Sequence, residues 1–564
     1  MLGTFPLATE PLAQVAGPAV QSPAYVELLA SQKPGIYLLE IEAYKGGEVV
    51  RSGGLAALAE IALADIPRGG GVNVGLITLR YADRDWVGAP DDPAQPNVYY
   101  EGRVSVPLVM SRIMPILPEE ERRVQRQFGL TEIINADGAL DQMQRGYAID
   151  GRRLRVLFGP VGGRYADFSV IADVIATGWT GDEAKAQLGL RDRAFSLDLP
   201  LQTNLFAGSG GAEGTAEIQG KPKPLAFGIA PNVTPVLIDP AHLIYQVHDG
   251  ALQAVDAVFD RGAELVASGV DVASFAALVA QSVPAGQFAT AKAVGLFKLG
   301  DMPTGLVTAD VRGDVTPFYA DTLDTICLRI LKVRAGLPAQ FLNQASFAGP
   351  AALGGALGIY LPHTEAPTTA QVVDRLIGSV GGWWGAARDG RIRAGRLSAP
   401  ESRAPTLFLD QNSILSLEPV EAPVPRWRQR VSYRPNWTEQ RGEDLADVVT
   451  AARRQFLTES SRAVSSASVA VKSRHLQALD PDPLASLYYD ADDAQRLADF
   501  LLALHSPDRR MFNVTVKRIG YQADYQTVTR ITWPRYALQN GQNFAVVGIN
   551  DQSDREETIL TVWG

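Results

Sequence analysis

The chain has 564 residues, which is too long for a single hydrophobic core and predicts roughly three or four domains. Its formal net charge of −10 argues against a surface that neutralises nucleic-acid phosphates. The 53 glycines and 36 prolines predict many turns, which favours β-rich domains over helical bundles. We therefore expect a mainly β fold with an α+β middle region.

Residues 1–34 contain spaced prolines and little hydrophobic periodicity. This pattern predicts an extended N-terminal arm, which would either clamp a neighbouring subunit or form a loosely packed terminus. Residues 1–22 lack the basic and apolar segments of a signal peptide, and no apolar run approaches the roughly 18 residues of a membrane-spanning helix. Stable membrane insertion is therefore not expected.

A first β-barrel-like domain, or a sandwich, is predicted over residues 35–205, where short strands are separated by turns. Strands are expected at 35–44, 76–81, 99–109, 129–135, 152–158, 168–178 and 189–197. An insertion at 53–71 interrupts them. Its apolar residues recur at helical spacing and end at Pro67 and three glycines, so a helix is expected there.

A mixed α/β middle region is predicted over residues 206–404, beginning within a Gly-, Ala- and Ser-rich stretch. Strands are expected at 244–248, 254–259 and 306–311, and helices around 323–331 and 371–378. A hairpin around Arg388–Arg391 would use Asp389-Gly390 as its turn. The single cysteine, Cys327, lies on the apolar stripe of the first helix and is interpreted as a core residue. One cysteine also excludes an intrachain disulfide.

A second β-barrel-like domain is predicted over residues 405–564, near a proline-spaced boundary at 400–425. Its strands are expected at 427–433, 511–520, 543–550 and 558–564, and its helices at about 443–456 and 492–505. No acid, base, nucleophile or ligand cluster accompanies the final strands.

Three motifs suggest ligand sites but fit local structure better. Gly214–Pro222 is one residue too long for a phosphate loop and has proline where magnesium needs a hydroxyl, so it is interpreted as a linker. Asn135–Asp141 lacks the later ligands of a calcium loop and predicts a turn before a short helix. Asp490–Asp493 fits a helix N-terminus, where carboxylates are favoured.

Candidate acid and base residues are few. None of the five histidines has a metalloprotease spacing, and His248 with Asp249 would point to opposite faces of a strand, which favours a structural histidine. Glu40 and Glu42 share one strand face with side chains roughly 7 Å apart, a separation between those of retaining and inverting glycosidases. Two solvated glutamates are the preferred interpretation.

Tryptophans could form a platform for sugars. The candidate pairs are Trp383 with Trp384 and Trp427 with Trp437. Consecutive strand residues face opposite sides, so at least one of the first pair is expected in the core. The sequence therefore assigns no catalytic, cofactor-binding or metal-binding residue.

Short segments distributed over nearly the whole chain occur in an order that resembles the order found in a known protein family. They are Leu39–Tyr44, Thr78–Asp83, Tyr100–Arg103, Ile134–Asp141, Gly151–Val156, Phe206–Gly208, Lys223–Gly228, Leu243–Gly250, Val255–Asp260, Thr308–Gly313, Gly382–Gly385, Asp389–Arg391 and Tyr433–Trp437. Together they resemble the tail-hub (tail-tip or baseplate hub) proteins of long-tailed bacteriophages and gene-transfer particles.

This resemblance implies two β-barrel-like tube domains on either side of a middle domain. A homotrimer would present six similar barrels, extend or cap the six-fold tail tube, adapt it to three-fold tip proteins and leave a channel for DNA exit. An acidic ring would let DNA slide without sticking. The implied partners are distal tail or tube proteins, the tape-measure protein and central fibre or receptor-binding proteins, in a virion assembled in the host cytoplasm. The insertion at 53–71 departs from the pattern, and no long C-terminal receptor-binding extension is expected.

Two other functions remain open from the residues. One is a cell-wall or polysaccharide hydrolase that uses paired carboxylates, and the other is a carbohydrate-binding tip module built on Trp383, Trp384 or Trp437. A non-enzymatic structural hub without cofactors is preferred, because it explains barrels at both ends of a chain that has no evident site.

Overall fold

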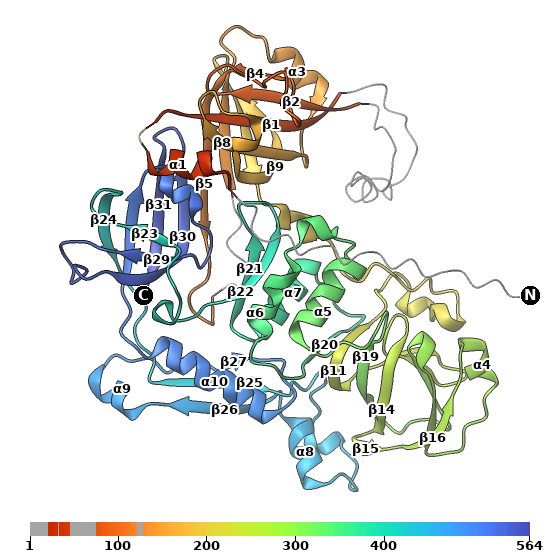
Figure 1. Cartoon of the computed structure of the whole chain (residues 1–564). Helices are drawn as coiled ribbons and strands as arrows, with labels where there is room; N and C mark the ends of the chain where they lie inside the picture. The colour runs from red at the N-terminus through yellow and green to blue at the C-terminus, as the bar shows by residue number, and fades with distance from the viewer. Residues whose placement is uncertain (1–20, 32, 46–74, 121–127) are drawn as a thin grey trace, which may run out of the picture.

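The computed structural model describes residues 21–31, 33–45, 75–120 and 128–564. These residues form a mainly β fold with several sheets, none of which closes into an uninterrupted ring of paired strands. Figure 1 shows one group of strands from the early part of the chain (orange, top) and one from its late part (blue and teal, left) beside a mixed middle region. The helix predicted at 53–71 lies outside the described residues.

The first β unit is a curled sheet. Its strand order is β5 (Val104–Ile113), β6 (Phe128–Ile134), β10 (Lys185–Arg191), β9 (Ser169–Gly181), β8 (Arg153–Pro160), β1 (Gly35–Lys45), β2 (Leu76–Ala82), β4 (Tyr99–Gly102) and β3 (Trp86–Val87). One residue, Arg103, joins β4 to β5, although these strands lie toward opposite ends of the order. The sheet therefore curls around its core, which contains Leu39, Ile41 and Leu154.

The second β unit is a smaller curled sheet. Its strand order is β23 (Leu407–Leu409), β29 (Val528–Ile531), β30 (Gln542–Gln552), β31 (Glu557–Trp563), β28 (Met511–Val516) and β24 (Ile414–Val420). A tight turn joins the two outer strands, since the Ile414 N–H donates to the Asp410 carbonyl at 2.9 Å. Both edges of the sheet must therefore approach each other around a core that includes Val514, Val546 and Leu560.

Residues between the strands of the second unit pack elsewhere. β25 (Arg428–Tyr433), β26 (Arg462–Ala467) and β27 (Leu484–Ala485) form a separate small sheet against α10 (Ala491–His505). Val431, Leu497 and Leu501 belong to the same buried cluster as the middle-region helices. The range 405–564 thus supplies both the second β unit and part of the middle region.

The middle region combines two five-stranded sheets with helices. The first sheet has the order β15 (Ala263–Glu264), β14 (Leu252–Asp260), β19 (Val307–Asp314), β11 (Leu225–Val233) and β20 (Gly358–Leu361), and the second has β12 (Val236–Asp239), β13 (Ile244–Gln246), β18 (Leu296–Leu299), β17 (Gln287–Ala291) and β16 (Val266–Asp271). Helices α5 (Leu323–Arg329) and α7 (Thr369–Gly378) enclose a large core with the hairpin β21 (Gly382–Ala386) and β22 (Ile392–Arg396). The predicted helix at 371–378 and the hairpin around 388–391 are confirmed.

The predicted extended arm is wrong where the structure describes it, because Pro23–Ala30 forms helix α1. Ser22 caps this helix by accepting the Tyr25 N–H, and Pro23 suits a first helical position. Its apolar side packs on β8, where the Tyr25 ring meets Phe158 edge-on at 6.4 Å. A segment this short shows too little hydrophobic periodicity to predict a helix, so its spaced prolines favoured an extended arm.

Further local predictions need correction. The strand predicted at 511–520 ends at Val516, and a 3-10 turn (Arg518–Gln522) follows it. The strand predicted at 189–197 ends at Arg191 and continues as a 3-10 turn (Arg193–Leu197), whose Ala194 and Leu197 join the middle-region core. The helix predicted at 443–456 begins later, as α8 (Ala451–Thr458), because the Thr450 side chain caps it. Before Thr450, Gly442–Asp444 form a 3-10 turn, and Leu445 and Val449 contribute buried apolar side chains from outside any helix.

Helix α7 provides a test of local stabilisation. The Thr368 hydroxyl accepts the Gln371 N–H at 3.2 Å, and the Gln371 side chain accepts the Thr368 N–H at 2.9 Å. We expect Thr368→Ala to lower the free energy of unfolding by about 1 kcal/mol, because the Gln371 N–H at the helix end loses its hydroxyl acceptor. Thr364→Ala, at an exposed position four residues earlier, is the matched control and should leave urea denaturation unchanged.

Candidate functional site: a buried ion cluster and a surface pocket

The two β units join edge to edge through β5 and β30. Residues Val109–Ile113 pair antiparallel with Gly548–Gln552, so one hydrogen-bonded path runs from β24 to β3 through both units. We call this pairing the seam. It links segments that lie far apart in sequence and fixes how the two units are oriented.

Asp551 on β30 is fully buried beside the seam. Its carboxylate accepts from Arg112 Nη2 at 3.1 Å and from both terminal nitrogens of Arg388 at 2.8 and 2.9 Å. The Thr558 hydroxyl donates to it at 3.1 Å. Arg112 belongs to the first β unit, Asp551 to the second and Arg388 to the middle region, so one ion cluster ties all three parts together.

Arg388 reaches the cluster from the tip of the β21–β22 hairpin. Its side chain is only 7% exposed and also donates to the Ala523 carbonyl at 2.7 Å and the Ile171 carbonyl at 3.2 Å. Its own carbonyl accepts the Asp173 N–H at 2.9 Å. The hairpin tip is therefore held by both β units.

Gly390 allows this close approach. Its φ is +72°, and a Cβ atom there would lie 2.8 Å from the Asp173 carbonyl oxygen. Both the backbone conformation and the space therefore favour glycine at this turn position.

The electrostatics of the cluster favour its charged form. Burial alone would raise the pKa of Asp551, but the Arg388 and Arg112 guanidiniums outweigh it and hold this pKa below its ordinary value. Both arginines are nearly as buried as the carboxylate, so removing one partner leaves a charge without adequate compensation.

We expect Arg388→Leu to lower the free energy of unfolding by about 3–5 kcal/mol, because Asp551 stays buried with one arginine fewer. Arg391→Leu is a matched control on the same hairpin, since among the described residues the partly exposed Arg391 side chain has a single ion contact, at 3.8 Å to Asp389. Its effect should stay within about 0.5 kcal/mol. Urea denaturation followed by circular dichroism measures both, and equal losses would contradict a special role for the cluster.

Glu40 and Glu42 do not form a pair of solvated carboxylates, so that interpretation is wrong for Glu40. Glu40 is buried and accepts from the Tyr100 hydroxyl at 2.6 Å and the Tyr165 hydroxyl at 2.7 Å, and it pairs with Arg155. Its oxygens are thus occupied by protein groups, and Glu42 alone remains partly exposed.

His248 is a structural residue, as the sequence predicted. It is fully buried, accepts the Ala226 N–H at Nδ1 and has Nε2 3.3 Å from Arg334 Nη2. Burial, helped by Arg334, lowers its pKa to about 3. The ring is therefore neutral at physiological pH and shielded from any substrate.

His248 generates a pH-dependent stability. The unfolded histidine has a pKa of about 6.5. Below that pH the unfolded chain binds a proton but the folded ring stays neutral, so protonation favours the unfolded state. This stabilisation is complete above pH 6.5 and is lost as the pH falls toward about 3.

Between pH 7.5 and pH 5.0, the free energy of unfolding of the wild type should fall by roughly 2 kcal/mol more than that of His248→Asn. Asparagine keeps an acceptor for the Ala226 N–H but cannot titrate. The partly exposed His475, changed to asparagine, is the control and should retain the wild-type pH dependence. Urea denaturation at the two pH values measures the difference, and parallel losses in all three proteins would contradict the assignment.

The other predicted candidates are also structural. Trp383 and Trp384 are both buried, so they form no exposed sugar platform, and Trp427 and Trp437 are half-buried. Cys327 is fully buried and burial raises the pKa of its thiol, which confirms it as a core residue.

Two loop predictions are also confirmed. Asn135–Asp141 forms a turn before the short helix α3 (Asp141–Gly146), with the Asn135 side chain donating to Asp141. Asp490 precedes α10, whose first turn carries Asp492 and Asp493.

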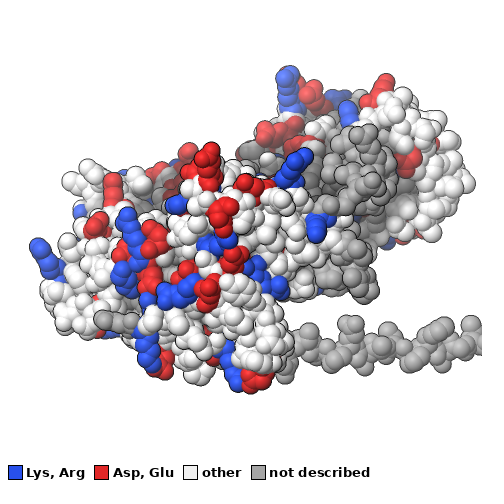
Figure 2. Space-filling view, turned by 90° about the horizontal axis from the view of Figure 1, so that it is seen from above, with Lys and Arg blue, Asp and Glu red and all other residues white. Residues whose placement is uncertain are grey.

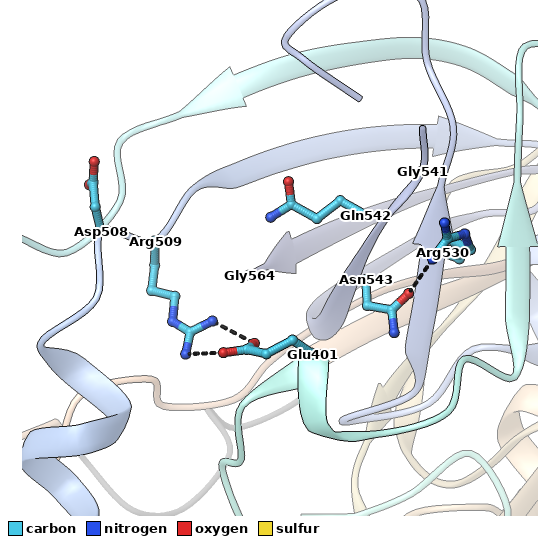
Figure 3. Close-up of a pocket in the computed structure, with 8 residues that line it drawn as sticks. All are labelled: Glu401, Asp508, Arg509, Arg530, Gly541, Gln542, Asn543 and Gly564. Carbon is cyan, nitrogen blue, oxygen red and sulfur yellow. Dashed lines mark hydrogen bonds and ion pairs between the residues drawn. The ribbon is translucent and has the colours of Figure 1, made fainter. Parts of the chain in front are cut away.

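A surface pocket of about 430 Å³ lies at one end of the second β unit. Figure 3 shows Glu401 and Arg509 facing each other on one side, and Arg530 with Asn543 on another. Two hydrogen bonds of 2.7 and 2.9 Å join Arg509 to Glu401. No sequence motif marks these residues, because the turn, the connection before β28 and the strands that carry them meet only in the folded protein.

The described ranges contain no group of three or more His, Cys, Asp or Glu side chains placed to hold a metal ion. Within the same ranges, no helix has the length and apolar character needed to cross a bilayer. Figure 2 shows acidic and basic side chains interspersed over one face, without a large area of a single sign.

No protein-family model and no curated protein matches the sequence. Among solved structures, the tail protein from Neisseria meningitidis MC58 is similar with a TM-score of 0.36 and 11% identity, over 82% of this chain and 95% of that chain. The 43 kDa tail protein of prophage MuSo2 from Shewanella oneidensis has a TM-score of 0.34 and 10% identity over the same shares. A chain of a native gene transfer agent virion has 0.37 and 12%, over 61% and 84%. Similarities of this size do not identify a function.

Proposed function

We propose that this protein is a structural, non-enzymatic hub of a bacteriophage tail tip or baseplate. Three copies form a ring that caps or extends the tail tube, adapts six-fold to three-fold symmetry and surrounds a channel for DNA exit. The proposal rests on the order of sequence segments that resemble tail-hub proteins and on the arrangement of the two β units.

The seam is the observation that carries the proposal. It joins two curled sheets edge to edge within one chain, and the buried cluster around Asp551 fixes them further. A subunit with two rigidly coupled β units can offer two neighbouring wall segments to a ring, so three subunits would supply six. The net charge of −10 suits a conduit that DNA crosses without binding.

The proposed partners follow from this role. They are copies of the same chain, distal tail or tail-tube proteins, the tape-measure protein and central fibre or receptor-binding tip proteins. The proposed location is the virion tail, after assembly in the host cytoplasm, and contact with DNA is limited to its passage.

Electron microscopy and analytical ultracentrifugation of the purified protein test the proposal. We expect a particle of about three times the chain mass of 60.6 kDa, seen as a three-fold ring with a central hole. Arg388→Leu should reduce the fraction of rings, because it loosens the coupling of the β units, whereas Arg391→Leu should not. A monomer at every concentration and in the presence of tail-tube protein would overturn the proposal.

The hydrolase and carbohydrate-binding alternatives receive no support from the described side chains. Glu40 is enclosed by two tyrosines and an arginine, and Trp383 and Trp384 are buried. Release of soluble fragments from purified cell walls, abolished by Glu40→Gln, would reverse this preference.

A further inference from the structure

We propose that the pocket at the end of the second β unit binds a carboxylate at Arg509, and that Glu401 occupies this position as an internal ligand in the isolated chain. The carboxylate would come from an acidic side chain of another protein or from a small free dicarboxylate. This inference does not depend on the hub function, because binding is measurable on the isolated chain.

Arg509 is a rigid receptor for a carboxylate. Its side chain is only 9% exposed, and its guanidinium lies 4.8 Å from the centre of the buried Trp563 ring. Nε is buried and has no hydrogen-bond partner among the described residues, so the two terminal nitrogens provide the binding fork. A guanidinium held in this way loses little entropy when it binds a carboxylate through two parallel hydrogen bonds.

Glu401 is suited to be displaced. It lies on a single 3-10 turn (Pro400–Ser402) in the connection between β22 and β23, and its side chain is 60% exposed. An ion pair with one such exposed partner contributes little to stability, so exchange of one carboxylate for another costs little. Arg509 lowers the pKa of Glu401, so the internal ligand is charged.

The rest of the pocket favours a negative ligand. Arg530, the second arginine of the lining, donates only to carbonyl and amide oxygens among the described residues and forms no ion pair there. The other acidic residue of the lining, Asp508, is exposed and points away from Arg509 in Figure 3. The lining thus has two arginines and two acidic side chains, and displacement of Glu401 leaves both arginines without an acidic partner in the pocket.

The geometry favours carboxylate over phosphate. The terminal nitrogens of Arg509 already hold a planar carboxylate with two hydrogen bonds, and a second carboxylate can repeat this arrangement without movement of the arginine. The volume of about 430 Å³ leaves room for one acidic side chain and its neighbouring residues.

Calorimetric titration of the full chain tests this site with three probes: succinate, the capped peptide Gly-Glu-Glu-Gly and inorganic phosphate. We expect Glu401→Gln to bind the carboxylate probes about tenfold more tightly than the wild type, because the internal competitor loses its charge. The double variant Glu401→Gln/Arg509→Gln should bind the carboxylate probes at least about tenfold more weakly than Glu401→Gln alone.

Controls separate binding from folding. Arg509→Lys keeps the charge but loses the fork, so in the Glu401→Gln background it should also weaken binding while thermal unfolding stays close to that of the parent. Glu421→Gln and Arg474→Gln change exposed residues outside the pocket and should leave the affinities unchanged.

Each outcome decides the proposal. If Glu401→Gln binds only the peptide more tightly than the wild type does, the source of the carboxylate is a protein partner. If it also binds succinate more tightly, the source is a small dicarboxylate. Failure of Glu401→Gln to tighten binding of either carboxylate overturns the proposal, as does phosphate binding that is tighter than both.

Discussion

The arrangement of this molecule depends on one buried carboxylate. Asp551 joins an arginine from the first β unit to an arginine from the middle-region hairpin, within a strand of the second β unit. Backbone pairing between β5 and β30 gives the two units a common edge and fixes how they are oriented. The ion cluster ties that edge to the middle-region hairpin, and loss of either arginine would leave Asp551 buried with less compensation.

Local structure could be predicted where the cause was local. The apolar stripe marked α7, and Asp389-Gly390 marked the turn of the hairpin, because helical periodicity and turn chemistry lie within a few residues. The partner of Arg388 could not be predicted, since Asp551 is 163 residues away. The same limitation hid the division of 405–564 between the second β unit and the middle-region core.

In the candidate site, too, features with a local cause could be predicted and features that depend on distant residues could not. Glu40 has the strand position of a solvated residue, but Tyr100 and Tyr165 cover it from loops and strands distant in sequence. No characteristic spacing marks Glu401, Arg509 and Arg530, because they come from a 3-10 turn, the connection before β28 and strand β29. Cys327 was recognised as structural because apolar periodicity is a property of the helix that contains it. His248 is structural as predicted, but it lies beyond the end of β13 at Gln246, so strand alternation is not the reason.

The seam has a consequence for the way the chain acquires its structure. Arg112 and Asp551 are separated by 439 positions, and closure of so long a loop must precede any gain from their contact. The first β unit has most of its own core and can order early, but its edge at β5 has no partner until β30 has been synthesised. During translation that edge is an exposed template for pairing with other chains, so rapid completion of the intramolecular seam protects the nascent protein from aggregation.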